Sequence, residues 1–201
     1  FKMTTGLFID VLKATIYADL LQRVRHRTLP YELKEGSVEA LFASSMDLCK
    51  ADLGDTNERY SKFASNIKKI TAEFDTIPLV EGLEKPRIGI VGEILAKYHP
   101  TANNHLEEIL YNEGAEVVMP DLMDFFMYMA YDDIISYKML SGKWLDKFKS
   151  ETAIKLMEFY RRPMRKALKN SKRFTAPCTI KQIAKLTDGH VSLGNMAGEG
   201  W

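Results

Sequence analysis

The feature that most constrains the fold is a strand–helix–strand pattern in the middle of the chain. Residues 87–92 form a short β-branched run that ends in glycine, which is typical of a buried parallel strand. A helical pattern from His105 to Glu113 follows, and residues 115–119 form a second apolar run that Pro120 ends. This order predicts a right-handed βαβ unit. We therefore expect an α/β fold with a flavodoxin-like or Rossmann-like parallel sheet and extra helices.

The first eighty or so residues have a different pattern. Apolar residues recur at helical spacing from about Thr5 to Arg27, and again in a helix that carries Tyr60. Another helix is predicted from about Ser37 to Lys50. The sequence thus predicts two regions, a helical bundle over residues 1–80 and the α/β domain over residues 85–201.

Helices are also expected after the second strand. The first is predicted to be capped by Asp121, and its apolar face comprises Leu122, Phe125, Phe126 and Met129. The others cover roughly residues 132–141, 143–160, 164–170 and 179–186, with Pro163 favouring the start of a new helix. Because the glycine-rich stretch 194–200 is typical of a lead into another element, we expect a longer protein and an α/β domain truncated at its C-terminus.

Composition excludes several classes of function. The 28 basic and 27 acidic residues leave a net charge of +1, which argues against a uniformly basic nucleic-acid binder. Two cysteines form neither a disulfide framework nor a complete Cys-ligated cluster. The longest apolar stretch is interrupted by Asp124 and is too short to span a bilayer. We expect a soluble protein of a reducing cytoplasm, without membrane or nucleic-acid partners.

The loop after the first expected strand is the main candidate for ligand binding, because ligands of open α/β sheets lie beyond the carboxyl ends of the strands. Its polar side chains are Glu93, Lys97, His99, Asn103 and Asn104. The next helix N-terminus could bind a phosphate or carboxylate, with Lys97 adding charge, and we expect Glu93 and His99 to line a cleft. Alternatively, Asn103 or Asn104 caps that helix and Glu93 pairs with Lys97.

Histidine and cysteine supply no clear chemical site. His99, His105 and His190 with Glu93 could in principle hold a metal, but the spacing of the first two matches no helical or finger pattern. We therefore expect no metal. Cys178 has no basic neighbour in the sequence, so we expect an inert thiol there.

Positive charge is concentrated between Lys138 and Arg173, where twelve basic and three acidic residues give a balance of +9. Two explanations stay open. In one, the charges solvate a helix that buries an apolar stripe made by Leu140, Trp144, Phe148, Leu156 and Phe159. In the other, they dock an acidic partner or phosphates, and the candidate docking residues are Arg161, Arg162 and Arg165.

Several blocks of the sequence resemble one known family. The central blocks are KPRIGIVGEI at residues 85–94, YHP at 98–100, NNHL at 103–106 and EGAEVVMP at 113–120, and flanking stretches lie at 19–21, 29–36 and 189–201. Together they resemble the large acyl-CoA dehydratase activase-related proteins, which belong with the 2-hydroxyglutaryl-CoA dehydratase family of anaerobic bacteria. Leu29 stands where the family has arginine.

The resemblance implies a two-component system. In the family, an ATP-driven activase with an iron–sulfur cluster passes an electron to a dehydratase, which has its own cluster and removes water from a 2-hydroxyacyl-CoA. The resemblance implies that this chain is the dehydratase-like module, and that the iron–sulfur cluster and ATP belong to the full-length system. Cys49 and Cys178 alone are not expected to hold a cluster.

Two classes of function follow from the resemblance. As an enzyme component, the chain would supply one wall of an acyl-CoA or cluster pocket through Glu93, His99 and Asn103. As a non-catalytic binding or scaffolding module, it would dock an activase or dehydratase partner through the basic helices of residues 138–173.

Overall fold

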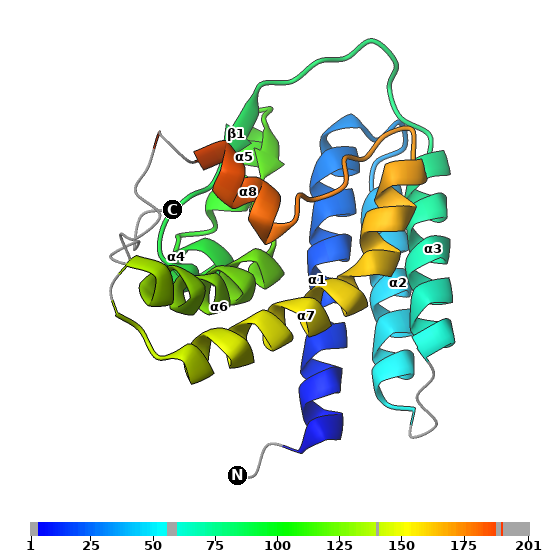
Figure 1. Cartoon of the computed structure of the whole chain (residues 1–201). Helices are drawn as coiled ribbons and strands as arrows, with labels where there is room; N and C mark the ends of the chain where they lie inside the picture. Colours follow the sequence, from blue (N-terminus) through cyan, green and yellow to red (C-terminus); the bar gives the residue numbers. More distant parts are fainter. Residues whose placement is uncertain (1–3, 56–59, 140, 188–189, 191–201) are drawn as a thin grey trace.

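The computed structural model describes residues 4–55, 60–139, 141–187 and 190, and helices make up most of it (Figure 1). The elements in chain order are α1 Thr5–Thr28, the 3-10 turn η1 Leu29–Tyr31, α2 Ser37–Leu53, α3 Tyr60–Thr76, β1 Arg87–Gly89, α4 Ile94–Tyr98, α5 Leu106–Asn112, β2 Glu116–Val118, α6 Leu122–Met139, α7 Trp144–Asn170 and α8 Ile180–Thr187.

The expectation of a flavodoxin-like or Rossmann-like sheet is wrong. The parallel strand pair itself is present, with Arg87 opposite Glu116 and Gly89 opposite Val118. In the part of the chain that the structure describes, however, β1 and β2 are the only strands, and each has three residues. All three residues of β1 are exposed, so the expectation of a buried strand is also wrong. The sheet does not continue because the apolar residues after Pro120 lie in helices that pack against each other and on α1.

Helix α1 is the centre of the structure. It packs against α2, α3, α6, α7 and β2. The helical spacing predicted from the sequence is confirmed, and the fully or almost fully buried members are Leu12, Ile16, Leu20 and Val24. At its start, the Thr4 hydroxyl accepts a hydrogen bond from the backbone N–H of Leu7 at 3.3 Å.

The turn after α1 ties three elements together. Leu29 and Pro30 are buried in η1, and the Tyr31 hydroxyl donates a hydrogen bond to the Glu116 carboxylate of β2 at 2.8 Å. The Glu32 carboxylate accepts from the backbone N–H groups of Gly36 and Val38, both at 2.9 Å, and so caps α2. Residues 29–36, one of the stretches on which the resemblance rests, therefore have structural roles.

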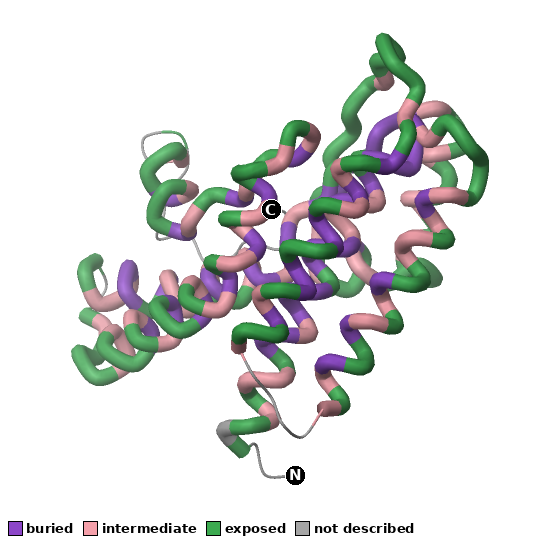
Figure 2. The backbone as a smooth tube through the Cα atoms, turned by 90° about the vertical axis from the view of Figure 1, so that its right-hand side faces the viewer, coloured by how far each residue is buried: buried purple, intermediate pink, exposed green. Residues whose placement is uncertain are grey.

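One main core joins the two predicted regions. It contains Ile16 and Phe63 from the first eighty residues together with Met123, Met164 and Leu168 from later helices. Figure 2 shows buried residues on the facing sides of the helices and exposed residues on their outer sides. A smaller core under the sheet comprises Ile90, Val117 and Met119.

The start of α6 is not capped by the predicted residue. The Asp19 carboxylate of α1 accepts hydrogen bonds from the backbone N–H groups of Leu122 at 2.7 Å and Met123 at 3.0 Å. Asp121 instead pairs with Arg23 and Arg161. Met123 and Met127 of this helix are fully buried in the core.

The apolar face predicted for α6 is correspondingly wrong. Phe126 and Met129 are exposed, and Leu122 and Phe125 are only partly buried. The helix also runs to Met139 without the break expected near Asp132.

Helix α7 runs through Pro163, so the prediction of a new helix there is wrong. Figure 1 shows α7 changing direction about midway, and its second half lies beside α3. A proline inside a helix leaves the carbonyl four residues earlier without its N–H donor. Here that carbonyl belongs to Phe159, and the Tyr60 hydroxyl of α3 donates to it at 3.2 Å. The tertiary contact thus replaces the missing helical bond.

Among the described residues, no helix combines the length and the apolar character needed to cross a membrane.

Candidate functional site

The loop between the strands contains the short helix α4, which the sequence did not indicate. Glu93 lies at its N-terminus, and its carboxylate accepts from the backbone N–H groups of Leu95 at 2.8 Å and Ala96 at 3.3 Å. This carboxylate therefore stabilises the first turn of α4. It is exposed.

The other candidates of this loop also hold the backbone. The Nδ1 atom of His99 accepts from the Ala102 N–H at 3.3 Å. Asn103 donates to the Lys97 carbonyl at 3.2 Å and accepts from the Leu106 N–H at 3.2 Å, so the capping alternative is confirmed for Asn103. Asn104 has a positive φ of 54° and is exposed.

Lys97 is turned inward. The residue is only 4% exposed, and its Nζ lies 5.6 Å from the centre of the Tyr98 ring. Burial lowers the pKa of Lys97, although the nearby Glu93 carboxylate acts in the opposite direction. Its position leaves little of its charge available to a ligand at the surface.

A cavity of about 420 Å³ lies next to this loop, between the end of α1 and α5. Asn103 is the one loop candidate among its lining residues, which do not include Glu93, Lys97, His99 or Asn104. His26 and Glu107, joined at 2.9 Å, form part of its wall, and the hydrogen bond from His26 lowers the pKa of Glu107. The structure therefore does not gather the five candidates around one ligand.

The donor groups do not fit a metal or an iron–sulfur cluster. Among the described residues, no three His, Cys, Asp or Glu side chains are grouped so that they could hold a metal ion. Cys49 is buried, and burial with the nearby Asp52 carboxylate raises the pKa of its thiol to about 12. Cys178 is exposed. Since the sequence has only these two thiols and a cluster needs several thiolates, the chain does not fit such a group.

Of the three arginines proposed for docking, Arg161 is not at the surface. Its side chain is 0% exposed and pairs with Asp121 and, at 2.6 Å, with Asp124. Arg165 is partly buried and donates to the Pro177 carbonyl at 3.1 Å and to Glu158 at 3.3 Å. Arg162 is exposed, with its guanidinium 5.6 Å from the centre of the Phe159 ring.

The apolar stripe predicted for the basic stretch does not form the buried face of α7. The buried face is instead made by Ser150, Ile154, Met157, Arg161, Met164 and Leu168. Leu140 lies outside the described residues. The reason for the difference is that the helix has two apolar faces. Helices α6, α3 and α1 bury one of them, whereas on the other the ring of Tyr60 from α3 stacks on Phe159 near its C-terminal end.

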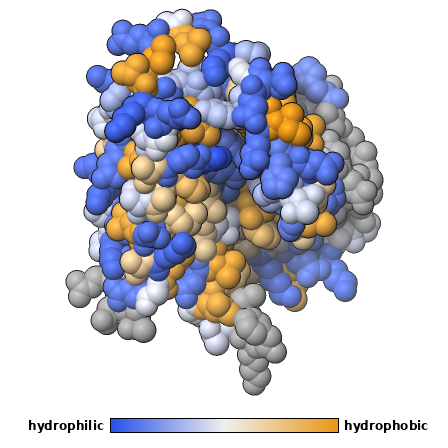
Figure 3. Space-filling model, turned by 180° about the vertical axis from the view of Figure 1, so that it is seen from behind, coloured by the Kyte–Doolittle hydropathy of each residue, from blue (hydrophilic) through white to orange (hydrophobic). Residues whose placement is uncertain are grey.

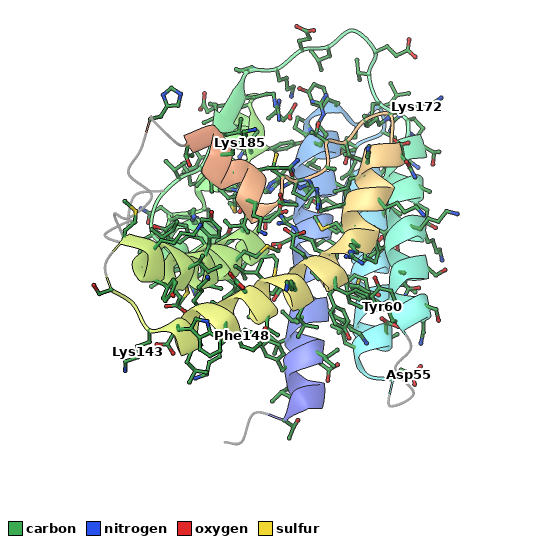
Figure 4. The ribbon with its side chains drawn as sticks, viewed as in Figure 1. Asp55, Tyr60, Lys143, Phe148, Lys172 and Lys185 are labelled. Atoms are coloured by element: carbon green, nitrogen blue, oxygen red, sulfur yellow. The ribbon has the colours of Figure 1, made fainter. Side chains whose placement is uncertain are left out.

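The other apolar face is exposed along the first half of the helix. We call it the α7 stripe, and its members are Trp144, Leu145, Phe148, Leu156 and Phe159. Trp144 is 62% and Phe148 55% exposed, and their rings stack with centroids 5.8 Å apart. Figure 4 labels Phe148 on this half of α7, with Lys143 just before the helix begins. An exposed apolar surface of this extent is typical of an interaction site.

Cations flank the α7 stripe. Helical spacing puts Lys149 at one edge of it and Lys155 and Arg162 at the other, where Trp144 lies, and all three cations are exposed. Glu151 lies at the same edge as Arg162 and pairs with Lys147 at 3.9 Å. Elsewhere on the molecule, the rear face seen in Figure 3 is largely hydrophilic with separate hydrophobic patches. The α7 stripe is thus an apolar surface with a basic border.

The sequence alone did not single out the arginines Arg27, Arg87 and Arg173, which the structure brings together around Glu116. They come from α1, β1 and the segment after α7, and no local spacing relates them. No protein-family model, curated protein or solved structure matches the chain.

Proposed function

We propose that this chain is a dehydratase-like module of an acyl-CoA dehydratase–activase system, and that it acts there by docking a partner through the α7 stripe. The family assignment is supported by the sequence blocks of residues 85–120, which resemble the activase-related proteins. The docking role is supported by one observation above all. An aromatic, apolar face of α7 is turned away from the core and bordered by cations.

The loop favours docking over catalysis. A wall of an acyl-CoA pocket would need Glu93 and His99 beside a cavity, yet neither lines the cavity next to this loop. Glu93 Oε2 and His99 Nδ1 instead accept hydrogen bonds from nearby backbone N–H groups. Only Asn103 supports the enzyme alternative, because it lines the cavity beside α5. Its side chain is already used in two hydrogen bonds.

The chemistry of the stripe defines the partner. From Trp144 to Phe159 the helix rises about 22 Å, which is enough to receive three to four turns of a partner helix. Trp and Phe side chains in such a strip are common binding hot spots. The flanking Lys149, Lys155 and Arg162 would face carboxylates and steer association. The expected occupant is therefore an apolar ridge with an acidic border on the activase or dehydratase partner.

The redox groups of the system belong to the partners in this proposal. An iron–sulfur cluster would supply electron transfer and ATP would drive it, but Cys49 and Cys178 do not fit a cluster. The role of this chain is to hold the partner in register, in the cytoplasm.

The test is a binding measurement with purified candidate activase and dehydratase partners at two salt concentrations. Trp144→Ser and Phe148→Ser should each weaken binding about tenfold or more, because each removes a large apolar contact. Lys149→Glu with Lys155→Glu should weaken binding most at low salt. Leu33→Ser is the matched control, since Leu33 is 65% exposed, close to the 62% of Trp144, but lies outside α7.

The proposal is overturned if the wild-type chain binds neither partner, or if the stripe variants bind as tightly as Leu33→Ser. Stability offers an internal check. Because the stripe is exposed, its variants should keep the free energy of unfolding of the wild type within about 0.5 kcal/mol.

A further inference from the structure

A hollow lined by arginines lies between α1, the two strands and the segment that follows α7. Two cavities of about 350 and 130 Å³ share four lining residues: Arg27 of α1, Arg87 of β1, Glu116 of β2 and Arg173. We call this place the arginine hollow. In Figure 1 the segment between α7 and α8 crosses α1 near its C-terminal end, which brings Arg173 to the hollow.

Glu116 fixes two of the arginines. Its side chain is only 2% exposed and accepts from Arg27, from Arg87 Nε at 3.0 Å and from the Tyr31 hydroxyl at 2.8 Å. The ring of Tyr31 also lies 5.5 Å from the guanidinium of Arg27. One carboxylate thus holds two guanidinium groups at a defined place, so little side-chain entropy remains to be lost on binding.

Arg173 is held differently. Its Nη1 donates to the backbone carbonyls of Phe74, at 3.1 Å, and Ile77. Neutral carbonyls orient the guanidinium without cancelling its charge. The Asp75 carboxylate accepts from the backbone N–H of Arg173 at 3.2 Å, but among the described residues no carboxylate lies within ion-pair distance of the guanidinium itself. This arginine is therefore a fixed charge beside two arginines that already share one carboxylate.

The hollow has a surplus of positive charge. Arg27, Arg87 and Arg173 carry three charges and Glu116 returns one, while Lys85 and Glu84 in the larger cavity cancel each other, which leaves +2. Nearby Arg23 is balanced by Asp121. Arg27 and Arg87 are partly exposed, at 44% and 64% of their side chains, so N–H groups that do not contact Glu116 remain accessible to a ligand.

We propose that the arginine hollow binds a phosphate group, either as free phosphate or as the end of a phosphomonoester. A phosphate dianion would balance the +2 surplus, and planar guanidinium groups offer paired N–H donors that match its oxygens. A single carboxylate would balance half of the charge. This site goes beyond the docking function and does not depend on it.

The test uses inorganic phosphate, phenyl phosphate and succinate as probes, with binding measured by calorimetry at low ionic strength. Arg87→Gln and Arg173→Gln should each weaken phosphate binding about tenfold or more, because each removes a charge-assisted contact. Arg173→Lys should bind phosphate with an affinity between those of the wild type and Arg173→Gln, since it keeps the positive charge and loses the planar, paired N–H donors of the guanidinium. Lys172→Gln is the matched control, because it removes the same charge from the neighbouring position. Figure 4 shows Lys172 just beyond the end of α7, and Lys172 lines neither cavity.

Tighter binding of phenyl phosphate than of inorganic phosphate assigns the site to phosphomonoesters, and the reverse assigns it to free phosphate. Both results support the proposal. It is overturned if wild-type protein binds neither probe, if succinate binds as tightly as both, or if Lys172→Gln weakens binding as much as Arg173→Gln. The melting temperature of the wild type provides a second measurement that needs no variant, and phosphate but not succinate should raise it.

Discussion

Tyr60 both stacks on the ring of Phe159, with centroids 4.9 Å apart, and donates its hydroxyl hydrogen to the backbone carbonyl of the same residue at 3.2 Å. The carbonyl is the one that Pro163 deprives of a helical donor. Helix α3 therefore supports α7 where the proline interrupts its hydrogen bonds. The contact also explains how one long helix continues where the sequence predicts two.

Tyr60→Phe should lower the free energy of unfolding by about 0.5–1.5 kcal/mol, because it keeps the stacked ring and removes one hydrogen bond. In a Pro163→Ala background the loss should be smaller, since the substituted alanine would restore an N–H donor to the Phe159 carbonyl. Urea unfolding of the four proteins in this double-mutant cycle gives the coupling energy. Equal losses in both backgrounds would show that the hydroxyl does not substitute for the helical bond.

Arg161→Met should destabilise the fold by about 3–5 kcal/mol, because it leaves Asp121 and Asp124 without their buried partner. Arg162→Met, one position along the same helix and exposed, is the control and should change stability by less than about 0.5 kcal/mol. Chemical unfolding of both variants measures the difference. Similar stabilities would contradict a structural role for Arg161.

Asp19→Asn should change the pH dependence of stability. Burial raises the pKa of Asp19 well above its ordinary value of 3.8, and the neighbouring Asp121 carboxylate raises it further. The folded protein therefore holds this proton more tightly than the unfolded chain, so stability falls as the pH rises from 3.8 through the raised pKa. Asparagine keeps a cap for α6 without that proton.

Relative to Asp19→Asn, the wild type should be most stable at the acidic end of this window and should lose that advantage as the pH rises. Urea unfolding of both proteins from acidic to neutral pH measures the difference. A difference that grows with pH would contradict the prediction.

Glu107→Gln should alter the pH dependence with the opposite sign. The hydrogen bond from His26 lowers the pKa of Glu107 below its ordinary value of 4.5. The lowered pKa of Glu107 therefore contributes stability that is present above pH 4.5 and is lost as the pH falls through the pKa of the folded state. Because the Glu107 side chain is partly exposed, the variant should lose about 1 kcal/mol or less of its free energy of unfolding above pH 4.5. Thermal or urea unfolding should show this loss shrinking in acid, and a loss that persists there would contradict the assignment.

Local patterns were sufficient for several of the individual elements, although not for α4 or for the full lengths of α6 and α7. The period of apolar residues predicted α1, α2 and α3 closely, and β-branched runs ended by glycine and proline predicted the parallel pair β1 and β2. These features depend on residues within one or two turns of each other, so the sequence carries them directly. The capping role of Asn103 could also be predicted, because a cap acts over three residues.

Local pattern was not sufficient to predict the long-range contacts. Helix α7 has two apolar faces, and only its packing on α6, α3 and α1 decided which one is buried and which forms the α7 stripe. The charge of Arg161 indicated a surface residue. Asp121, just before α6, and Asp124, in α6, pair with Arg161 and so allow the arginine to be buried in the core. The cap of α6 came from Asp19, more than a hundred residues away.

The sequence by itself thus determined α1, α2, α3 and one parallel strand pair, since propensity, periodicity and capping act between neighbours along the chain. Only the tertiary structure decided that the pair is not extended into a larger sheet among the described residues, and that Arg27, Arg87 and Arg173 meet around Glu116. The physical reason is that burial, ion pairing and the satisfaction of backbone groups depend on which distant segments are in contact.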